Sequence, residues 1–400
     1  MRILTFSTLY PNAARPAHGI FVETRLRELL AGGKFESQVV APVPWFPWSH
    51  SLFGQYAQYA NAPREEVRHG VRVLHPRYPA LPKIGMTVAP FLLAFAVRPV
   101  IQQVLARYAF DVIDAHYFYP DGVAAAILGR YFRKPVVITA RGSDVNEISQ
   151  YYLPRRMIQW AAMQAAGVVT VCRALKHSLM AIGVPEQRIT VLRNGVDLQL
   201  FHPLDRGMVR RELGFSRTTL LSVGHLVPLK GHDIAIGALR LLPECDLVVA
   251  GSGPQHAALV SLASDLGVAD RVSFAGVLSQ VELQRYYSAA DALVLASSTE
   301  GWANVLLESM ACGTPVVATD AGGTSEVVTA PEAGMLFEER TPEALARAVR
   351  RLLERSPDPR VTRRYAEQFS WAATAVGQAQ LFERILSMPR TSAEARALAR

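Results

Sequence analysis

Short apolar runs alternate along the chain with longer stretches in which apolar residues recur at helical spacing. Runs such as Arg2–Ser7, Val112–Ala115 and Val316–Ala318 have the length and composition of buried strands. Phe21–Ala31 instead has the apolar spacing of an amphipathic helix. Parallel strands need a crossover connection, which is usually a helix. The alternation therefore predicts an α/β fold with two doubly wound parallel-sheet domains and a cleft between them.

The stretch with the clearest candidate chemistry is Ser297–Gly323, which reads SSTEGWANVLLESMACGTPVVATDAGG. Glu300 lies in a loop directly after the predicted strand Ala292–Ala296, and Glu308 lies in a short predicted helix that begins near Asn304. In an open parallel sheet, ligands bind at the loops that follow the carboxyl ends of strands. We therefore expect this loop and the start of its helix to line a ligand site.

Glu308 has the apolar neighbours Leu306, Leu307 and Met310. A carboxylate in such surroundings needs a polar partner. The two hydroxyls of a ribose would supply one, and so would a backbone amide or an arginine. The residues alone leave these alternatives open.

The net charge of +8 is unevenly distributed. Residues 1–200 contain 22 lysines and arginines against 12 aspartates and glutamates, whereas residues 201–400 contain 20 against 22. The chain lacks zinc-ligand spacing and the aromatic signature of RNA-binding modules, so we expect no nucleic-acid partner. A basic first half instead favours an anionic membrane surface or a phosphate-bearing acceptor.

Two segments of the first half bear on membrane contact. The loop Pro42–Phe53 contains Trp45 and Trp48, and Ile84–Val97 carries no charge. That run is shorter than the roughly 18 residues of a membrane span, so it fits either a buried core helix or a helix lying on a membrane surface. The N-terminus lacks the apolar core of a secretory signal, and the three cysteines show no metal-ligand spacing. We therefore expect a cytoplasmic protein, with peripheral membrane contact as a hypothesis.

The segment EGWANVLLESMACGTPVVATDAGGTSEVV, residues 300–328, resembles the signature of the family-4 retaining glycosyltransferases, which have the two-domain GT-B fold. Ser309 stands where alanine is commoner. The resemblance covers residues 1–388 and implies a hexosyltransferase. Such an enzyme would move a sugar from a UDP- or GDP-sugar to a lipid-linked or polysaccharide acceptor in cell-envelope or exopolysaccharide biosynthesis.

The resemblance also implies roles for residues in the second half. Glu300 would hold the donor sugar, Glu308 would hold the ribose, and Lys230 would bind the diphosphate. His225 stands where the family has arginine, so the chain departs from the pattern there. The further donor-binding candidates in this half are Gly251, Gly253, Val277, Gly301, Trp302, Ala303, Asn304 and Val305, and Gly19 is a further candidate in the first half.

Candidates in the first half follow strands. His116 comes at the end of Val112–Ala115, and the resemblance places such a histidine beside the donor sugar, although a lone histidine is often only a core residue. Arg141 stands where the family often has histidine, and could bind a phosphate or an anionic acceptor. Asp144 is also an acceptor or phosphate candidate, but it could instead pair with Arg141 and make this site purely structural. Arg193 and Asn194 are the remaining acceptor or phosphate candidates.

The resemblance and the turn at Asn194-Gly195 divide the chain. We expect an acceptor-binding domain over residues 1–197, a linker over 198–215 and a nucleotide-sugar-binding domain over 216–370. A helix over 371–388 would cross back onto the first domain, followed by a tail over 389–400.

The sequence contains no D-x-D pair, so we expect no metal and no other cofactor. The departing phosphate would then be stabilised by Lys230, His225 and helix N-termini. No nucleophile is evident, which favours attack on the same face of the sugar, assisted by the leaving phosphate. Three alternatives remain: an epimerase or phosphorylase of the same fold, a Rossmann-type oxidoreductase, and a non-catalytic membrane-surface protein. The oxidoreductase is disfavoured because Gly251-Ser252-Gly253 lacks the third glycine, where His256 stands.

Overall fold

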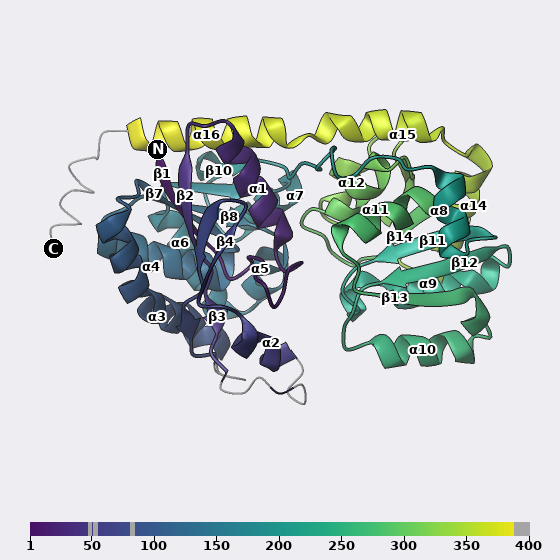
Figure 1. Cartoon of the computed structure of the whole chain (residues 1–400), viewed down its shortest axis with the longest axis horizontal. Helices are drawn as coiled ribbons and strands as arrows, with labels where there is room; N and C mark the ends of the chain where they lie inside the picture. Colours follow the sequence, from purple (N-terminus) through teal and green to yellow (C-terminus); the bar gives the residue numbers. More distant parts are fainter. Residues whose placement is uncertain (47–49, 51–54, 81–84, 388–400) are drawn as a thin grey trace. The chain divides into compact units, whose positions relative to one another are not determined.

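The structure is a computed structural model that describes residues 1–46, 50, 55–80 and 85–387. Its backbone forms two compact units (Figure 1). The first unit contains Met1–Arg193 together with Ala372–Arg400, and the second contains Asn194–Trp371.

The first unit is built on an eight-stranded sheet. Every neighbouring pair in it is parallel except β4 and β5 at one edge. Apolar β-branched residues fill its central strands, as is typical of a sheet buried on both faces. The strands in spatial order are β10 (Ile189–Val191), β9 (Gly167–Thr170), β8 (Val136–Ala140), β7 (Val112–His116), β1 (Arg2–Phe6), β2 (Glu36–Val40), β5 (Val71–Leu74) and β4 (Glu65–Arg68).

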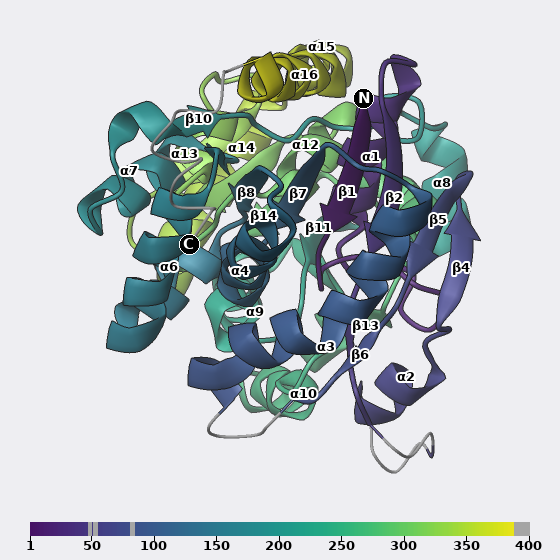
Figure 2. The ribbon, with the colours of Figure 1, turned by 90° about the vertical axis from the view of Figure 1, so that its left-hand side faces the viewer.

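Helices cover this sheet. Helix α3 packs against α4 and α6, and these three are seen together in Figure 2. The C-terminal helix α16 (Trp371–Ser387) contributes Leu381 and Phe382 to a core cluster with Ile3 and Val112, so it is part of the first unit. The other helices of the unit are α1 (Ile20–Ala31), α2 (Gln55–Asn61), α3 (Gly85–Arg107), α4 (Val123–Phe132), α5 (Ser143–Asn146), α6 (Tyr152–Gln164) and α7 (Arg173–Ala181).

The second unit is built on a six-stranded sheet whose strands are all parallel. Its core packs strand residues such as Leu247 and Val294 against helix residues such as Ile236 and Val349. The strands in spatial order are β13 (Val272–Gly276), β12 (Cys245–Ala250), β11 (Thr218–Val223), β14 (Ala292–Leu295), β15 (Val316–Thr319) and β16 (Gly334–Phe337). The helices are α8 (Arg206–Leu213), α9 (His232–Ala238), α10 (His256–Asp265), α11 (Gln280–Ala289), α12 (Asn304–Ala311), α13 (Thr324–Val327), α14 (Pro342–Arg355) and α15 (Pro359–Ala366).

Some predicted segments differ from the observed ones. Residues 198–215, expected to be a linker, include helix α8 and belong to the second unit. Asp205 caps α8 by accepting a hydrogen bond from the amide of Met208, a local signal for a helix start. Of the aromatic loop over 42–53, Pro47, Trp48 and Phe53 lie outside the described residues, as do Ile84 and the tail over 389–400.

Helix α3 is longer than the uncharged run that predicted it, because it continues past Arg98 to Arg107. Its segment Met86–Arg107 is long and apolar enough, by length and composition alone, to cross a membrane, with a mean hydropathy of 1.6. One side of it packs into the first unit, where Leu93, Val97 and Ile101 are fully buried. The opposite side is exposed at Phe91 and Phe95. Core burial is therefore confirmed for one face of the helix, and membrane contact through the other face stays a prediction.

Candidate active site

The candidate donor residues of the second unit lie where the strand order of its sheet reverses. Strand β11 is flanked by β12 and β14. The strands that follow it in sequence are added first on one side of β11, as β12 and β13, and then on its other side, as β14 to β16. Such a reversal leaves a crevice at the carboxyl ends of the strands. Lys230 follows β11 and Glu300 follows β14, and the two side chains meet there in an ion pair, Nζ to Oε1, of 2.6 Å.

Two glycines with left-handed backbones hold these loops in place. A Cβ atom at Gly231 (φ 68°) would lie 2.2 Å from the carbonyl oxygen of Ala296, and one at Gly322 (φ 61°) would lie 2.1 Å from that of Glu300. Neither position has room for a side chain. The close approach therefore fixes the backbone on either side of the ion pair.

Hydrogen bonds join the two loops directly. The amide of Ser298 donates to the carbonyl of Leu229 at 2.8 Å. The guanidinium of Arg340 donates to the carbonyls of Ala296 and Pro228, both at 2.7 Å. Lys230 and Glu300 are thus held on a braced scaffold, with 24% and 9% of their side chains exposed.

Helix α12 starts next to Glu300. Its N-terminus has no side-chain cap, so the first amides of the helix lack the partner that a cap would supply. The segment Gly301–Val305 forms this start, and the side chain of Asn194 donates to that of Asn304 at 3.3 Å. The arrangement leaves a row of backbone donors beside the carboxylate of Glu300.

Glu308 lies one turn further along α12 and accepts a hydrogen bond from the hydroxyl of Tyr287 at 2.9 Å. Neither of the alternatives weighed for its partner, a backbone cap or an arginine, occurs among its recorded hydrogen bonds and ion pairs within the described residues. Burial raises the pKa of Glu308 to about 7, and the bond from Tyr287 limits the rise. This carboxyl group therefore changes its charge near neutral pH.

The titration of Glu308 gives a pH-dependent prediction. If Glu308 holds a ribose, as the resemblance implies, nucleotide-sugar affinity should fall as the pH drops through about 7, because a ribose hydroxyl donates more strongly to a carboxylate than to a carboxylic acid. If only the ionised form binds, the loss between pH 8 and pH 6 is about tenfold. Calorimetric titration of the wild type and of Glu308→Gln at both pH values tests this. The variant should bind weakly with a flat profile, and an equal slope in both proteins would exclude Glu308 as the titrating group.

The remaining donor candidates of the second unit lie on the neighbouring loops. His225 is exposed in the loop after β11, and Val277 is 65% exposed just after β13. Gly251 and Gly253 follow β12 and flank Ser252, whose carbonyl accepts from the amide of Leu226 at 2.9 Å. The loops after β11, β12, β13 and β14, together with helix α12, thus gather the donor candidates of this unit at one edge of the sheet.

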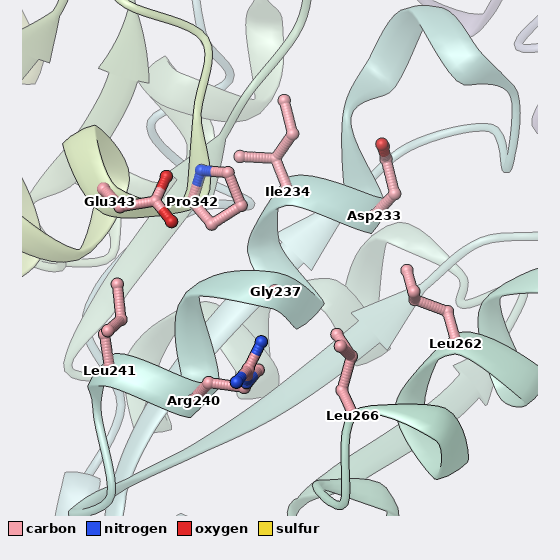
Figure 3. A pocket seen from close by; sticks show the side chains of 9 residues that line it. All are labelled: Asp233, Ile234, Gly237, Arg240, Leu241, Leu262, Leu266, Pro342 and Glu343. Atoms are coloured by element: carbon pink, nitrogen blue, oxygen red, sulfur yellow. The ribbon is translucent and has the colours of Figure 1, made fainter.

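A separate hollow of about 480 Å³ lies elsewhere on the second unit, over α9 and α10 and the start of α14 (Figure 3). Arg240 and the carboxylates Asp233 and Glu343 line it together with aliphatic side chains. None of the donor candidates contributes to its lining. It is therefore distinct from the candidate active site.

In the first unit, His116 ends β7 at the corresponding reversal of strand order, between β7 and β1. Only 1% of it is exposed, and both ring nitrogens have partners. Nδ1 lies 2.7 Å from Nη2 of Arg141, and Nε2 lies 3.1 Å from Oδ2 of Asp114. An arginine only donates, so Nδ1 must accept and Nε2 must carry the proton. Burial lowers the pKa of His116 to about 4, which keeps the ring neutral.

His116 is therefore placed to orient Arg141 instead of meeting a ligand with a free nitrogen. Arg141 also lies over the ring of Phe21, 5.1 Å from its centroid. Burial lowers the pKa of Arg141 to about 9, which still leaves it charged at neutral pH. In this part of the unit, the guanidinium of Arg141 is the group that can bind an anion. The ring of Phe21 and the imidazole of His116 hold it in position.

The network behind His116 includes residues that the sequence did not indicate. Asp114 also accepts from the side-chain amide of Gln378 at 2.8 Å, and Gln378 in turn accepts from Nε of Arg25 at 2.7 Å. Arg25 is 1% exposed and donates also to the carbonyl of Leu192. A charged residue on the core side of helix Phe21–Ala31 is the signal that could have revealed Arg25, because arginine is almost never buried unless it is paired.

Asp144 is fully buried and braces the loop to which it belongs. Its carboxylate accepts from the amides of Phe118 at 2.6 Å, Gly142 at 2.7 Å and Arg141 at 3.0 Å. These bonds commit Asp144 to the local backbone. Its contribution is therefore to fix the position of Arg141.

A second buried carboxylate, Asp121, was not among the candidates. It accepts from the amide and the hydroxyl of Thr8, and so joins the loops after β1 and β7. Burial raises the pKa of Asp121 to about 8. Gly19 lies at the other end of the β1 loop, in a left-handed conformation at the start of α1. Arg193 and Asn194 lie at the junction of the two units, Arg193 in the first and Asn194 in the second.

Comparison with known proteins relates both units to sugar-transferring enzymes. Residues 209–369 match the family model described as Glycosyl transferases group 1, and residues 31–200 match the model Glycosyltransferase Family 4. A relative from Bacillus subtilis (strain 168), TuaC, is described as a glycosyltransferase of teichuronic acid biosynthesis. It is 30% identical over 363 residues, which cover 88% of this chain and 89% of TuaC. The chain is a family-4 glycosyltransferase.

Solved structures agree on the fold of this glycosyltransferase. Sucrose-phosphate synthase from Thermosynechococcus elongatus superimposes with a TM-score of 0.79 at 21% identity, covering 97% of this chain and 100% of the other. Anabaena HepE in complex with UDP-glucose gives 0.74 at 21% identity, with 97% and 100% covered. The predictions of the family, of the GT-B fold and of an enzyme of the hexosyltransferase class are confirmed.

Proposed function

We propose that this glycosyltransferase moves a hexose from a UDP- or GDP-sugar to a lipid-linked or polysaccharide acceptor in cell-envelope biosynthesis, with retention of the anomeric configuration. The observation that carries the proposal is the Lys230–Glu300 pair at the strand reversal of the second unit, with Glu308 one helical turn beyond the uncapped start of α12. Support also comes from HepE, which was solved with UDP-glucose, and from TuaC, whose description assigns it to teichuronic acid biosynthesis.

The donor would be held by groups with separate tasks. Glu300 and the first amides of α12 bind the hydroxyls of the sugar, and Glu308 binds the ribose. Lys230 moves from Glu300 to the diphosphate and neutralises charge that grows as the sugar–phosphate bond breaks. His225 supplies one further donor, and no fixed charge, where an arginine would supply a bidentate cation.

We further propose transfer without a metal or other cofactor. Among the described residues, no group of three or more His, Cys, Asp or Glu side chains is arranged to hold a metal ion. The attacking hydroxyl then approaches on the face that the diphosphate leaves, and a phosphate oxygen takes its proton. Arg141 is the group that would bind an anionic part of the acceptor.

Slow hydrolysis of nucleotide sugars in the absence of acceptor tests this proposal. The expected product from an α-linked donor is the α-sugar, seen by proton NMR before it mutarotates, in the presence of EDTA as in its absence. Release of the β-sugar would contradict retention, and loss of turnover with EDTA would contradict the metal-free route. An epimerised nucleotide sugar, or turnover that needs inorganic phosphate, would instead indicate the epimerase or phosphorylase alternative.

The proposed location is the cytoplasmic face of the cell membrane. Val88, Phe91 and Phe95 recur on one face of α3 and are 36%, 52% and 73% exposed. The guanidinium of Arg98 lies over the ring of Phe95 and over that of Tyr131, which is 57% exposed. We call Val88, Phe91, Phe95 and Tyr131 the apolar stripe. An apolar helix face flanked by a cation has the composition of an interfacial helix.

The double variant Phe91→Ser/Phe95→Ser should bind anionic vesicles about tenfold or more weakly than the wild type, because the apolar area that each phenylalanine buries in the lipid is lost. Co-sedimentation with vesicles at low salt measures this. Val67→Ser, at a side chain that is 70% exposed on β4, is the matched control and should bind as the wild type does. Unchanged binding of the double variant, or no binding by the wild type, would contradict membrane contact through the stripe.

A further inference from the structure

A hollow of about 390 Å³ in the first unit is lined by Arg64, Arg72, Arg77 and Arg107 among other residues. It lies between helix α3 and the β4–β5 edge of the sheet. Arg64, Arg72 and Arg77 reach it from the sheet side, and Arg107 reaches it from the last turn of the helix. The floor is aliphatic, with Val100 and Val104 from α3.

One of these arginines, Arg72, is paired with the carboxylate of Glu65, on which the charge of Arg107 also acts. Arg72 forms a bidentate pair with Glu65, at 2.6 and 3.0 Å. Among the described residues, Arg64, Arg77 and Arg107 form no recorded ion pair with a carboxylate. The nearby Glu66 is bound to the imidazole of His75 at 2.8 Å. The hollow therefore keeps an excess of positive charge.

Arg77 has a guanidinium nitrogen that lacks a hydrogen-bond acceptor among the described residues. One of its terminal nitrogens, Nη2, donates to the carbonyl of Ala62. The other, Nη1, is buried and has no hydrogen-bond partner within the described part of the chain. Burial and the nearby charge of Arg64 lower the pKa of Arg77. A buried guanidinium N–H without an acceptor is costly, and an anion in the hollow would remove that cost.

We propose that this hollow is a binding site for a phosphate group, held by Arg64, Arg77 and Arg107. Three guanidinium groups around one cavity suit a group with several acceptor oxygens and more than one negative charge. Arginine recognises phosphate by paired N–H donors, and the excess charge of the hollow matches a phosphate better than a single carboxylate. The site lies in the first unit and uses none of the residues assigned to the sugar donor.

Two sources of phosphate fit this chemistry, a lipid headgroup and a soluble phosphate. Three residues of the apolar stripe, Val88, Phe91 and Phe95, belong to helix α3, which also supplies Val100, Val104 and Arg107 to the hollow. A helix with an apolar face beside a cationic pocket can hold a headgroup while its aromatic side chains enter the lipid. A free phosphate would need only the arginines.

Arginine modification by phenylglyoxal, with the sites located by peptide mass spectrometry, distinguishes these sources in the full-length protein. Labelling is done alone, with inorganic phosphate, with phosphatidylcholine vesicles, and with vesicles that also contain phosphatidylglycerol. Arg64 and Arg107 are exposed and should react with phenylglyoxal. A phosphate bound in the site should lower the rate of their modification severalfold. Arg27, exposed on α1, is the internal control and should label equally throughout.

Protection by both inorganic phosphate and phosphatidylglycerol vesicles supports a phosphate site that takes headgroups. Protection by inorganic phosphate alone supports the site with a soluble ligand, and protection by the anionic vesicles alone supports it with a lipid. No protection of Arg64 and Arg107 by either probe, or equal protection of Arg27, overturns the proposal.

The double variant Arg64→Gln/Arg107→Gln provides a second measurement, and Arg27→Gln/Arg211→Gln, which removes the same charge at two other exposed arginines, is its control. Both replaced side chains are exposed and make no recorded hydrogen bond, so the variant should fold. If the anionic vesicles protect the arginines from labelling, the double variant Arg64→Gln/Arg107→Gln should bind these vesicles about 30-fold more weakly than the wild type. This corresponds to about 1 kcal/mol for each arginine removed. Glu300→Gln should show wild-type protection, so failure of the sugar-transfer assignment would leave this result unchanged.

Discussion

Replacing Lys230 by alanine should lower the rate of sugar transfer by a factor of about 10² to 10³, with the fold retained. Lys230 is the cation at the strand reversal of the second unit, 2.6 Å from Glu300. In the proposed mechanism it meets the charge that develops on the departing diphosphate. Because His225 brings no guanidinium to the same loop, little remains to take over this task.

Steady-state kinetics at saturating donor measure the effect. Lys230→Arg, which keeps the charge, should recover part of the rate, and Lys34→Ala, at an exposed lysine of the first unit, should leave it unchanged. Glu300→Ala should be as severe, since the donor sugar would lose its carboxylate partner. Near-normal turnover of Lys230→Ala or Glu300→Ala would refute the assignment of this pair.

The stability of the first unit should depend strongly on one buried carboxylate. Asp114→Asn should lower the free energy of unfolding by about 3–5 kcal/mol, because it removes the negative charge that faces the guanidinium groups of Arg25 and Arg141. Asp114 is 1% exposed and is bound by His116 and Gln378. Urea unfolding followed by circular dichroism measures the change.

A double-mutant cycle separates charge from packing at this position. Arg25→Met alone should also destabilise, because it leaves Asp114 with less compensation. The double variant Arg25→Met/Asp114→Asn should lose clearly less free energy of unfolding than the sum of the two single variants, because it buries neither charge. Strict additivity, or a loss below about 1 kcal/mol for Asp114→Asn, would contradict a coupled network.

Local patterns were sufficient to predict most of the sheet. The apolar runs Val112–Ala115 and Val316–Ala318 fall within β7 and β15, and Phe21–Ala31 falls within α1. These signals are local, because strand composition and the apolar spacing of a helix act over a few residues. Glu300 and Lys230 were both candidates, although their contact spans 70 residues, since each follows a strand whose carboxyl end faces the same edge of the sheet.

Partners of buried polar groups could not be predicted in the same way. Arg25 meets Gln378 across 353 residues of chain, and Glu308 meets Tyr287 of the preceding helix α11. Neither contact produces a periodic pattern in the sequence, because each requires only a single polar side chain at one position of a packed surface. That His116 lies beside the donor sugar stays a prediction, whereas the partners of its two ring nitrogens, Arg141 and Asp114, were not predicted.

The measurement that tests the central claim most directly is a thermal-shift panel with uridine, guanosine and adenosine diphosphates and their sugars, on the wild type and on Lys230→Ala. A ligand at about 100 times its dissociation constant adds about 2.7 kcal/mol of stability. Uridine or guanosine ligands should stabilise the wild type, and the shift should shrink in Lys230→Ala. An equal shift in both proteins, or no shift with any nucleotide, would contradict a nucleotide-sugar site at Lys230 and Glu300.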